Sequence, residues 1–539
     1  MNIKLTTFLI ATFVPFFAFS QIDNKILEGL SFRNIGPAGM SGRITSIDVD
    51  PSTNNIIYAG SASGGLWRSL NAGQSWNSIW DDQPTAGIGV VKLDPNNSDI
   101  IWVGTGEGNP RNSQSSGAGL FKSIDGGESF KFVGLKETKH IHKIVIDPRN
   151  SDIVYVAAFG VAWGETNERG VYKTTNGGKT WKKILFNNNL TGAADLVMDP
   201  ANPNKLFCAM WEYRRWPWFF KSGGKGSGLY MTLDGGENWK KITENEGLPK
   251  GELGRIGIAV AKSNSKTVYA LIENKEKNGL YTSKDGGFNW SLVSEDENIG
   301  NRPFYYSDIH VDPFNENTIY SLWSIMTKSD DGGKSWRVIA PYYKIHPDHQ
   351  ALWMDPNRPG HMIEGNDGGV NITWDGGDSW RFVENLPVAQ FYHINVDNQK
   401  PYNVYGGMQD NGSWKGPAYS WVGTGIGNGE WQELYFGDGF DVLPHPSDQR
   451  VVYAMAQEGY LARIDTRTGG VELIKPVHPK GETLRWHWNA PIAQDPFNQD
   501  AIYYGSQFVH YSNDQGKNWE IISTDLTTND PEKQRSLES

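Results

Sequence analysis

The sequence predicts an all-β fold, a β-propeller of four-stranded blades, from two repeated segments. One is an octapeptide with the pattern S/T-x-D/N-x-G-x-S/T/N-W/F. Its eight copies start at Ser69, Ser123, Thr174, Thr232, Ser283, Ser329, Thr373 and Ser512. The other segment precedes the octapeptide and consists of an alternating apolar strand, an Asp-Pro turn and a second apolar strand, as in residues 44–60. Four short strands in a repeat of about 50 residues are typical of a propeller blade.

Each octapeptide is predicted to be a tight turn between two strands. Its hydroxyl and carboxylate accept backbone N–H hydrogen bonds, and its glycine permits a positive φ angle. The closing aromatic side chain points inward and adds buried area. Asn71 and Asn176 replace the aspartate in two copies, which keeps the acceptor but removes the charge. Because the whole turn is repeated, we interpret these carboxylates as structural rather than as metal or substrate ligands.

The Asp-Pro segment occurs in seven clear and three weaker copies, which predicts ten blades. The clear copies lie at Ile44, Val90, Lys143, Asp199, Asp312, Asp355 and Asp495, and the weaker ones at Ala261, Asp397 and Pro444. Octapeptides are present in each of the first seven repeats, the last of which ends at Trp380. We therefore expect a seven-bladed propeller over residues 22–384, three blades of a second propeller over 385–525 and a polar tail over 526–539. The alternative is one ten-bladed ring. Because the polar tail ends abruptly, a further alternative is that the chain is a truncated form of a longer protein.

The N-terminus predicts export. Residues 1–20 have a basic start at Lys4, an apolar run over 8–19 and a small-residue cleavage site near Ser20-Gln21, as in a secretory signal peptide. No later segment is apolar enough to cross a membrane. We expect a mature protein that is secreted, periplasmic or at the cell surface, without membrane insertion.

Composition excludes several classes of partner and site. The net charge of −11 argues against nucleic acid or an anionic membrane surface as partner. Cys208 is the only cysteine, so no intrachain disulfide or cysteine-based metal cage can form. His346, Asp348 and His349 resemble a metal cluster, but in an extended segment His349 points to the opposite face from the other two. We expect no cofactor and no metal.

The octapeptides resemble Asp-boxes, the BNR repeats of sialidases, xyloglucanases and sortilin-type sorting receptors. Together with the Asp-Pro segments they are most similar to large secreted bacterial BNR-repeat proteins, which are described as glycosyl hydrolases or sortilin-like. The resemblance covers about residues 29–525. It implies the propeller fold and leaves the activity open, because propellers host many functions. Xyloglucanase-like enzymes place their acid and base between two propellers, but their N-terminal catalytic motif is not matched here. Residues 32–37 are only loosely similar to the start of sialidases.

Candidate binding residues lie on the rim that the repeated turns do not occupy. The segment between the second and third strands of the fourth repeat combines aromatic and arginine side chains, which suit a sugar ring or a protein partner. The alternative is that this segment folds over its own blade or packs against the second propeller. The expected ligand-binding residues are Trp211, Tyr213, Arg214, Arg215, Trp216 and Trp218, with Trp414 and Trp486 from later blades.

Acidic residues gather on the same rim in later repeats. An inverting glycosidase needs two carboxyl groups about 6.5–9.5 Å apart, and neighbouring blades can place two of these so. The alternative is that they cap turns. The candidates are Asp308, Asp348, Asp367, Asp410 and Asp438.

Three functions follow from these features. The leading hypothesis is an exported propeller that binds a glycan or protein ligand on its variable rim. The first alternative is a glycoside hydrolase that cleaves a polysaccharide with paired carboxylates, and the second is a sortilin-like receptor that binds a peptide segment.

Overall fold

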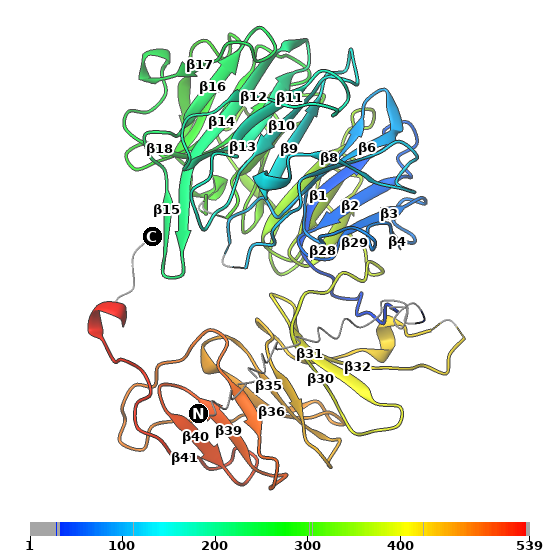
Figure 1. The fold of residues 1–539 in the computed structure, drawn as a ribbon, viewed down its shortest axis with the longest axis vertical. Coiled ribbons are helices and arrows are strands. Elements are labelled where there is room, and N and C mark those ends of the chain that lie inside the picture. Colours follow the sequence, from blue (N-terminus) through cyan, green and yellow to red (C-terminus); the bar gives the residue numbers. More distant parts are fainter. Residues whose placement is uncertain are drawn as a thin grey trace, which may run out of the picture. The chain divides into compact units, whose positions relative to one another are not determined.

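The computed structural model describes residues 29, 33–111, 113–300, 302–303, 305–423 and 425–534. The predicted signal peptide lies outside these residues. All described strands belong to one unit, Gly36–Ser539. Between them lie short 3-10 helices: η2 (Lys136–Thr138), η3 (Glu244–Glu246), η4 (Glu297–Ile299), η5 (Asn428–Glu430), η6 (Gln457–Gly459) and η7 (Pro531–Gln534). The fold is all-β, as predicted (Figure 1).

Seven antiparallel sheets follow one another in the first part of the described chain. In each sheet the strands lie side by side in chain order, and the fourth sheet adds a hairpin arm, β15, to β14. The strands are β1 (Ile44–Val49), β2 (Ile57–Ser61), β3 (Leu66–Ser69) and β4 (Asn77–Ser78); β5 (Ile88–Asp94), β6 (Asn97–Thr105), β7 (Leu120–Ser123) and β8 (Lys131–Gly134); β9 (Ile141–Ile146), β10 (Val154–Ala158), β11 (Gly170–Thr174) and β12 (Lys182–Leu185); β13 (Thr191–Asp199), β14 (Asn202–Trp216), β15 (Phe219–Ser222), β16 (Gly228–Thr232) and β17 (Lys240–Ile242); β18 (Leu253–Val260), β19 (Val268–Asn274), β20 (Gly279–Ser283) and β21 (Ser291–Ser294); β22 (Asp308–Val311), β23 (Ile319–Leu322), β24 (Met326–Ser329) and β25 (Arg337–Ala340); β26 (His349–Met354), β27 (Met362–Asn366), β28 (Gly369–Thr373) and β29 (Arg381–Phe382).

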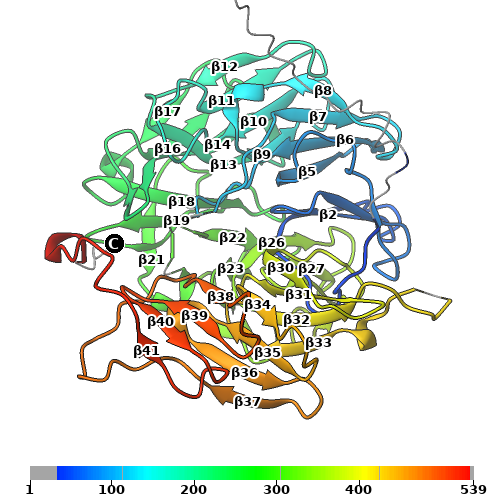
Figure 2. The same cartoon turned by 60° about the horizontal axis from the view of Figure 1, so that its bottom comes forward.

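Three further sheets of the same design follow, shown in yellow, orange and red in Figure 2. Their strands are β30 (Phe391–Val396), β31 (Asn403–Met408), β32 (Gly412–Pro417) and β33 (Gln432–Tyr435); β34 (Val442–Pro444), β35 (Val451–Met455), β36 (Leu461–Asp465) and β37 (Gly470–Leu473); β38 (Ile492–Gln494), β39 (Ile502–Gly505), β40 (Val509–Ser512) and β41 (Glu520–Ile521). Four-stranded antiparallel sheets made from consecutive strands are the blades that the repeats predicted.

The octapeptides form the expected turns. In the copy at Ser329, Oγ accepts a hydrogen bond from Gly333 N at 2.8 Å, and Asp331 Oδ1 accepts one from Ser335 N at 2.9 Å. All eight copies repeat these two bonds at the same spacing. The residue before the invariant glycine also has positive φ, even where it is Ala72 or Gln515. Each closing aromatic packs into a different apolar cluster, so the turns fasten the blades to one another.

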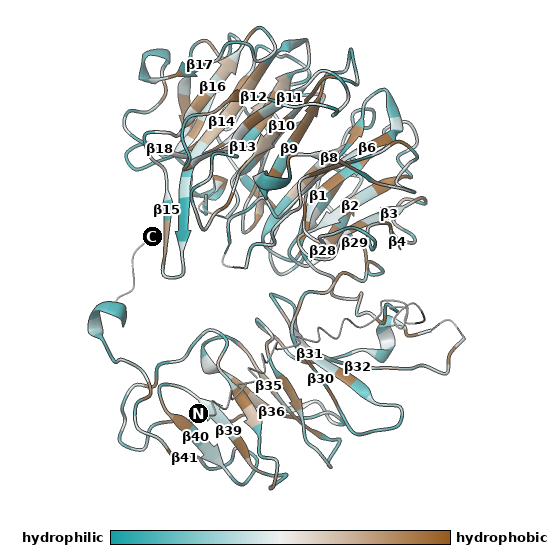
Figure 3. Ribbon diagram, in the orientation of Figure 1, coloured by the Kyte–Doolittle hydropathy of each residue, from teal (hydrophilic) through white to brown (hydrophobic). Residues whose placement is uncertain are grey.

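Apolar packing joins neighbouring sheets, and apolar residues, shown in brown, recur along the strands in Figure 3. One cluster unites β1 with β27 and β28, through Ile44 and Val49 on the first sheet and Ile363 and Val370 on the seventh. The first and the seventh sheet are therefore neighbours. On this contact we propose that the division predicted near residue 384 separates a seven-bladed ring from three further blades, rather than one ring of ten.

The first strands of five sheets line a common cavity of about 230 Å³: they are β1, β5, β9, β22 and β26. On the proposed division, this cavity is the channel of the seven-bladed ring. It contains Asp308, the first of the five predicted carboxylates, together with Lys143 and His142.

Candidate functional site

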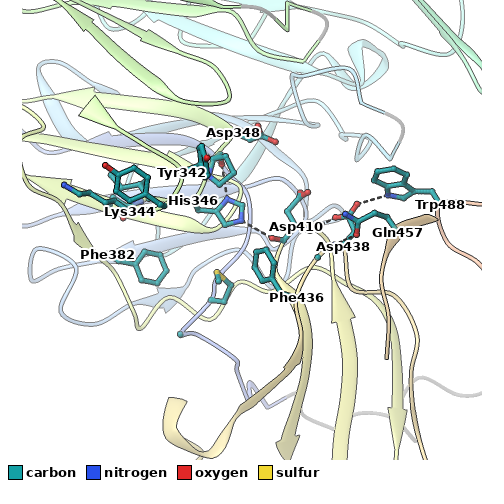
Figure 4. A pocket seen from close by; sticks show the side chains of 17 residues that line it. Tyr342, Lys344, His346, Asp348, Phe382, Asp410, Phe436, Asp438, Gln457 and Trp488 are labelled. Atoms are coloured by element: carbon teal, nitrogen blue, oxygen red, sulfur yellow. Dashed lines mark hydrogen bonds between the residues drawn. The ribbon is translucent and has the colours of Figure 1, made fainter. Parts of the chain in front are cut away.

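Four of the five predicted carboxylates come together on connections between strands. Asp348 precedes β26, Asp367 lies between β27 and β28, Asp410 between β31 and β32, and Asp438 between β33 and β34. They line two adjoining cavities of about 570 and 620 Å³. Three of them, Asp348, Asp410 and Asp438, line both cavities, as does Trp488 (Figure 4).

Asp367 is held by a buried arginine. Nε and Nη2 of Arg43 donate to its two carboxylate oxygens at 3.0 and 3.1 Å, and Tyr305 donates to Oδ2 at 2.9 Å. Gln350 donates to Oδ1 at 3.0 Å. Only 2% of Asp367 is exposed. The two-point contact with Arg43 fixes the position of this buried carboxylate.

Arg43 also reaches two other carboxyl groups. Its Nη1 donates to Glu107 Oε1 at 3.2 Å, and its Nη2 lies 3.5 Å from Asp410 Oδ2. Burial raises the pKa of Glu107 to about 7, although Arg43 opposes this shift. Nη2 of Arg43 lies 3.1 Å from Oδ2 of Asp367 and 3.5 Å from Oδ2 of Asp410. The two carboxylate oxygens therefore lie close to each other.

Among the carboxyl groups that line the cavities, Asp410 has the pKa that is raised most. Burial raises its pKa to about 9, and the charges of Asp367 and Asp438 add to the shift. The side chain keeps 29% of its surface exposed, so it remains accessible from the cavity. Its backbone has a φ of +59°, in a region that non-glycine residues adopt rarely and that clusters at functional sites. Burial thus shifts Asp410 toward its protonated form, while its side chain stays accessible from the cavity.

Asp438 lies next to Asp410. Its Oδ1 accepts the backbone N–H of Asp410 at 2.7 Å, and its Oδ2 accepts Nε1–H of Trp488 at 2.7 Å. Figure 4 shows Asp410, Asp438 and Trp488 in a row along the cavity. Both oxygens of Asp438 therefore serve as acceptors beside a carboxyl group that keeps its proton.

Asp348 closes the group from the side of the first ring. Its Oδ1 accepts a hydrogen bond from Tyr306 at 2.5 Å and lies 3.4 Å from Nη1 of Arg302. Burial and the nearby Asp367 raise the pKa of Asp348. It shares with Asp410 a positive φ, here +66°. Two aspartates with this backbone conformation thus face the same cavities.

Asp308 does not join this group. It lies in the ring channel, where Lys143 Nζ is 3.3 Å and Arg255 Nη2 is 3.6 Å from its oxygens. Burial acts to raise its pKa, but Lys143 and the other nearby cations hold the pKa of Asp308 below its ordinary value. The expectation that it could pair with the other carboxylates is wrong for this position, because an inner-strand residue faces the channel.

The predicted aromatic segment is not one exposed surface. β14 continues to Trp216 and pairs with β15, which extends beyond the rest of its sheet in Figure 1. Alternation along β14 turns Trp211 and Tyr213 inward, where both are fully buried against Phe159. The prediction that these two residues contact a ligand is therefore wrong.

The tip of the hairpin formed by β14 and β15 is exposed, and Arg215 near the tip lines one of the cavities. Trp218 is 70% exposed, while Trp216 is half-buried beneath the guanidinium of Arg214, 4.9 Å from its ring centre. Arg215 lines the larger cavity and donates two hydrogen bonds to the carbonyl of Pro110, at 3.1 and 2.9 Å. A ligand-binding role for these four residues stays a prediction.

The two later tryptophans serve packing more than the cavity. Trp414 donates to the carbonyl of Asn411 at 2.6 Å. Trp486 stacks on His510 and packs against Tyr504 inside the tenth blade. The residue that faces the cavity is instead Trp488, two positions later and 49% exposed.

The predicted site residues did not include several residues that the structure places there. Arg43, Glu107 and Tyr305 form the buried support of the site, and Trp488 forms part of its wall. The signal that pointed to Arg43 is an arginine directly before the mostly buried strand β1. Within the described residues no group of three or more histidine, cysteine or acidic side chains is arranged to hold a metal ion.

Comparisons with known proteins agree with this architecture. The family model "Sortilin-Vps10" (Sortilin, neurotensin receptor 3) matches residues 118–279. A xyloglucanase from Hypocrea jecorina is 23% identical over 402 residues, which cover 67% of this chain and 41% of that protein. A xyloglucanase from a Paenibacillus species is 23% identical over 357 residues, which cover 58% and 32%. The chain resembles xyloglucanases. It spans about two fifths or less of the length of these relatives.

Solved structures show the same fold. A GH74 xyloglucanase from Xanthomonas campestris superposes with a TM-score of 0.52 at 16% identity, covering 92% of this chain and 94% of that one. An ancestral GH74 enzyme gives a TM-score of 0.60 at 18% identity, covering 90% and 69%. At these identities the likeness shows the propeller fold alone. The predicted resemblance to Asp-box propellers, sortilin-like proteins and xyloglucanases is confirmed.

A search for membrane-spanning helices covered the part of the chain that the structure describes. It contains no helix with the length and apolar character needed to cross a bilayer.

Proposed function

We propose that the protein is a glycoside hydrolase acting on a polysaccharide, with Asp410 and Asp438 as its reacting carboxyl groups. The observation that carries this proposal is the meeting of two carboxyl groups where two cavities adjoin, one of them with a pKa that burial raises. Perturbed carboxyl groups in a cleft are the pattern expected of a hydrolytic site.

The two groups suit the two proton transfers of the reaction. With a pKa of about 9, Asp410 keeps its proton at neutral pH and can donate it to the glycosidic oxygen as the carbon–oxygen bond breaks. Asp438 can take a proton from the water whose oxygen bonds to the anomeric carbon. The indole of Trp488, fixed by its hydrogen bond to Asp438, offers an apolar face for a sugar ring. Asp348, which lines both cavities, is the alternative proton acceptor.

Similarity to proteins named xyloglucanases supports a polysaccharide substrate and makes xyloglucan the first one to test. The predicted signal peptide supports export, which would bring the protein to extracellular polysaccharides.

The hypothesis favoured by the sequence, glycan or protein binding without hydrolysis, is the second candidate. The exposed Trp218 and Trp488 favour it, because a pure binding site needs the aromatic faces but not the protonated Asp410. A sortilin-like peptide site in the ring channel has less support. That cavity holds only about 230 Å³ and already contains the ion pair of Lys143 with Asp308.

Hydrolysis is tested by incubating the purified chain with xyloglucan and a panel of other plant and bacterial polysaccharides. We expect new reducing ends from at least one of them, and none when Asp410→Asn is used. Asp375→Asn, which changes an octapeptide turn remote from the cavities, is the control and should retain activity. Binding of a glycan by the unaltered chain with no reducing ends from any member of the panel would favour the second candidate.

A further inference from the structure

One wall of the larger cavity is cationic. It is formed by Arg111 from the connection between β6 and β7, Arg215 from the end of β14 and Arg302 from the connection before β22. We call these three residues the arginine wall. The guanidinium carbons of Arg111 and Arg302 lie 5.9 and 5.4 Å from the ring centre of Tyr305, and that of Arg43 lies 5.8 Å from it. Three arginines around one cavity stand out in a chain with a net charge of −11.

Arg111 has hydrogen-bonding capacity that the protein does not use. Its Nε and Nη1 are buried and have no hydrogen-bond acceptor among the described residues. Leaving buried donors without an acceptor costs free energy, and the cost is larger for charged groups. A ligand that supplies acceptor oxygens beside Arg111 would recover that cost.

The second arginine favours the same kind of ligand. Arg215 is 9% exposed, and its two hydrogen bonds to Pro110 go to a neutral carbonyl oxygen. Burial lowers the pKa of its guanidinium, so a negative charge placed beside it would be stabilised.

The carboxylates of the cavity have partners of their own. Both oxygens of Asp367 bind Arg43. Both oxygens of Asp438 also accept hydrogen bonds within the site. Asp348 contacts Arg302 at 3.4 Å. In the described contacts no carboxylate of the cavity binds the two unsatisfied nitrogens of Arg111.

We propose that the arginine wall is a subsite for an anionic substituent of the glycan, a uronic acid carboxylate or a sulfate ester, bound next to the reacting carboxyl groups. The inference rests on the proposed function and specifies its substrate class. The planar guanidinium group matches the oxygens of carboxylate and sulfate, with charge-assisted hydrogen bonds. Xyloglucan lacks such a substituent in its backbone, so this subsite would distinguish the protein from the relatives named for that substrate.

Binding is measured by calorimetry on the full chain carrying Asp410→Asn, which prevents turnover and keeps the cavity uncharged at this position. The probes are glucuronic acid-containing xylo-oligosaccharides, the same compounds after carboxyl reduction, sulfated galactan oligosaccharides and neutral xyloglucan oligosaccharides. We expect one anionic class to bind at least about 10-fold more tightly than its neutral counterpart, because charge-assisted hydrogen bonds are each worth about 10- to 100-fold in affinity. The two anionic arms identify whether the group is a carboxylate or a sulfate.

Two variants test the arginine wall itself. Arg111→Gln removes a donor that contacts no reacting carboxylate. Ser113→Asp adds a negative charge at an exposed position of the same cavity, where it has little effect on folding. Each should reduce the preference for the anionic oligosaccharide by about 10-fold or more, and 0.5 M salt should weaken it as well. Arg467→Gln, an exposed arginine in the turn after β36, is the matched control and should change nothing.

Equal affinity for anionic and neutral oligosaccharides, or a preference that survives in both variants, would overturn the subsite. Tighter binding of an acidic peptide than of any glycan would overturn it too. If the unaltered chain hydrolyses neutral polysaccharides without any anionic preference, the subsite fails and the proposed function stands. If the unaltered chain prefers anionic oligosaccharides but hydrolyses no polysaccharide, and both variants lose that preference, the subsite is supported and the proposed hydrolase activity is contradicted.

Discussion

The backbone N–H of Asp410 donates a hydrogen bond of 2.7 Å to Oδ1 of Asp438. This bond ties the turn between β31 and β32 to the connection between β33 and β34, which joins one blade to the next, so that the two carboxyl groups face the same cavity. The left-handed backbone of Asp410 directs its N–H toward Asp438 and leaves its side chain at the cavity. The pair, rather than either residue alone, is the unit that mutations should test.

Asp410→Asn and Asp438→Asn should each lower the rate of polysaccharide hydrolysis by at least ~10²-fold, because each removes one of the two proton transfers. Substrate affinity should change little. Steady-state kinetics with direct binding measurements separate the two effects. Asp348→Asn shows whether the alternative acceptor is used, and full activity in both Asp410→Asn and Asp438→Asn would rule out the assigned pair.

The stability of the protein should depend on pH through Asp410. An unfolded aspartate titrates near pH 3.9, whereas the folded state keeps this proton up to a pH of about 9. Between these values the folded state binds one proton more than the unfolded state, so the free energy of unfolding falls as pH rises. Asp410→Asn lacks this group and tolerates the same backbone conformation. Urea unfolding at pH 5 and pH 8 should show the variant gaining stability relative to the original protein at the higher pH. Parallel pH dependence of the two proteins would contradict the raised pKa.

The aspartates of the octapeptides should matter for stability and not for the ligand. Asp285 Oδ1 accepts backbone N–H bonds from Phe288 and Asn289 at 3.0 and 2.9 Å. Asp285→Ala removes both and should lower the free energy of unfolding by about 1–2 kcal/mol. Denaturant unfolding and ligand titration on the same variant check this. Weaker binding at unchanged stability would show that the turn belongs to a site.

Two tryptophans of one hairpin should behave in opposite ways. Trp211 is fully buried and Trp218 is 70% exposed. Trp211→Ala opens a cavity in the core and should cost about 3–5 kcal/mol of stability. Trp218→Ala, alone or with Trp216→Ala, should leave the melting temperature unchanged and weaken ligand binding. Unaltered affinity in the double variant would remove the hairpin tip from the binding surface.

Repetition made the fold predictable from the sequence. The octapeptide encodes a local turn, so the bonds of Ser283 and Asp285 follow from residues four positions apart. The same reasoning selected by exclusion the four carboxylates that line the cavities, because Asp367 and Asp410 occupy turns that the repeated motifs leave free. It failed for Trp211 and Tyr213 because it treated their segment as a connection. β14 runs for 15 residues, and its alternation decides which side chains are buried.

The support of the site was beyond the reach of sequence patterns. Arg43 and Asp367 are 324 residues apart, and no local periodicity relates them. The choice between Trp486 and Trp488 likewise depends on packing, since Trp486 fills a place against Tyr504 and His510 that its neighbour does not reach. Perturbation of the pKa of Asp410 depends on Asp367 and Asp438, which only the folded chain brings near.

Arg43 also sets an order of events during synthesis. It stands just before the first strand of the first blade, while its partners Asp367 and Asp410 emerge from the ribosome more than 300 residues later. Contacts of such long sequence separation form late, because the entropy of closing the intervening chain must be offset first. Until then Glu107, 64 residues from Arg43, is its one partner among these carboxyl groups, and the first blade lacks the seventh blade that it packs against. Asp410 would therefore acquire its raised pKa only in the last stage of folding. A partly folded chain would have most of its blades but no working site.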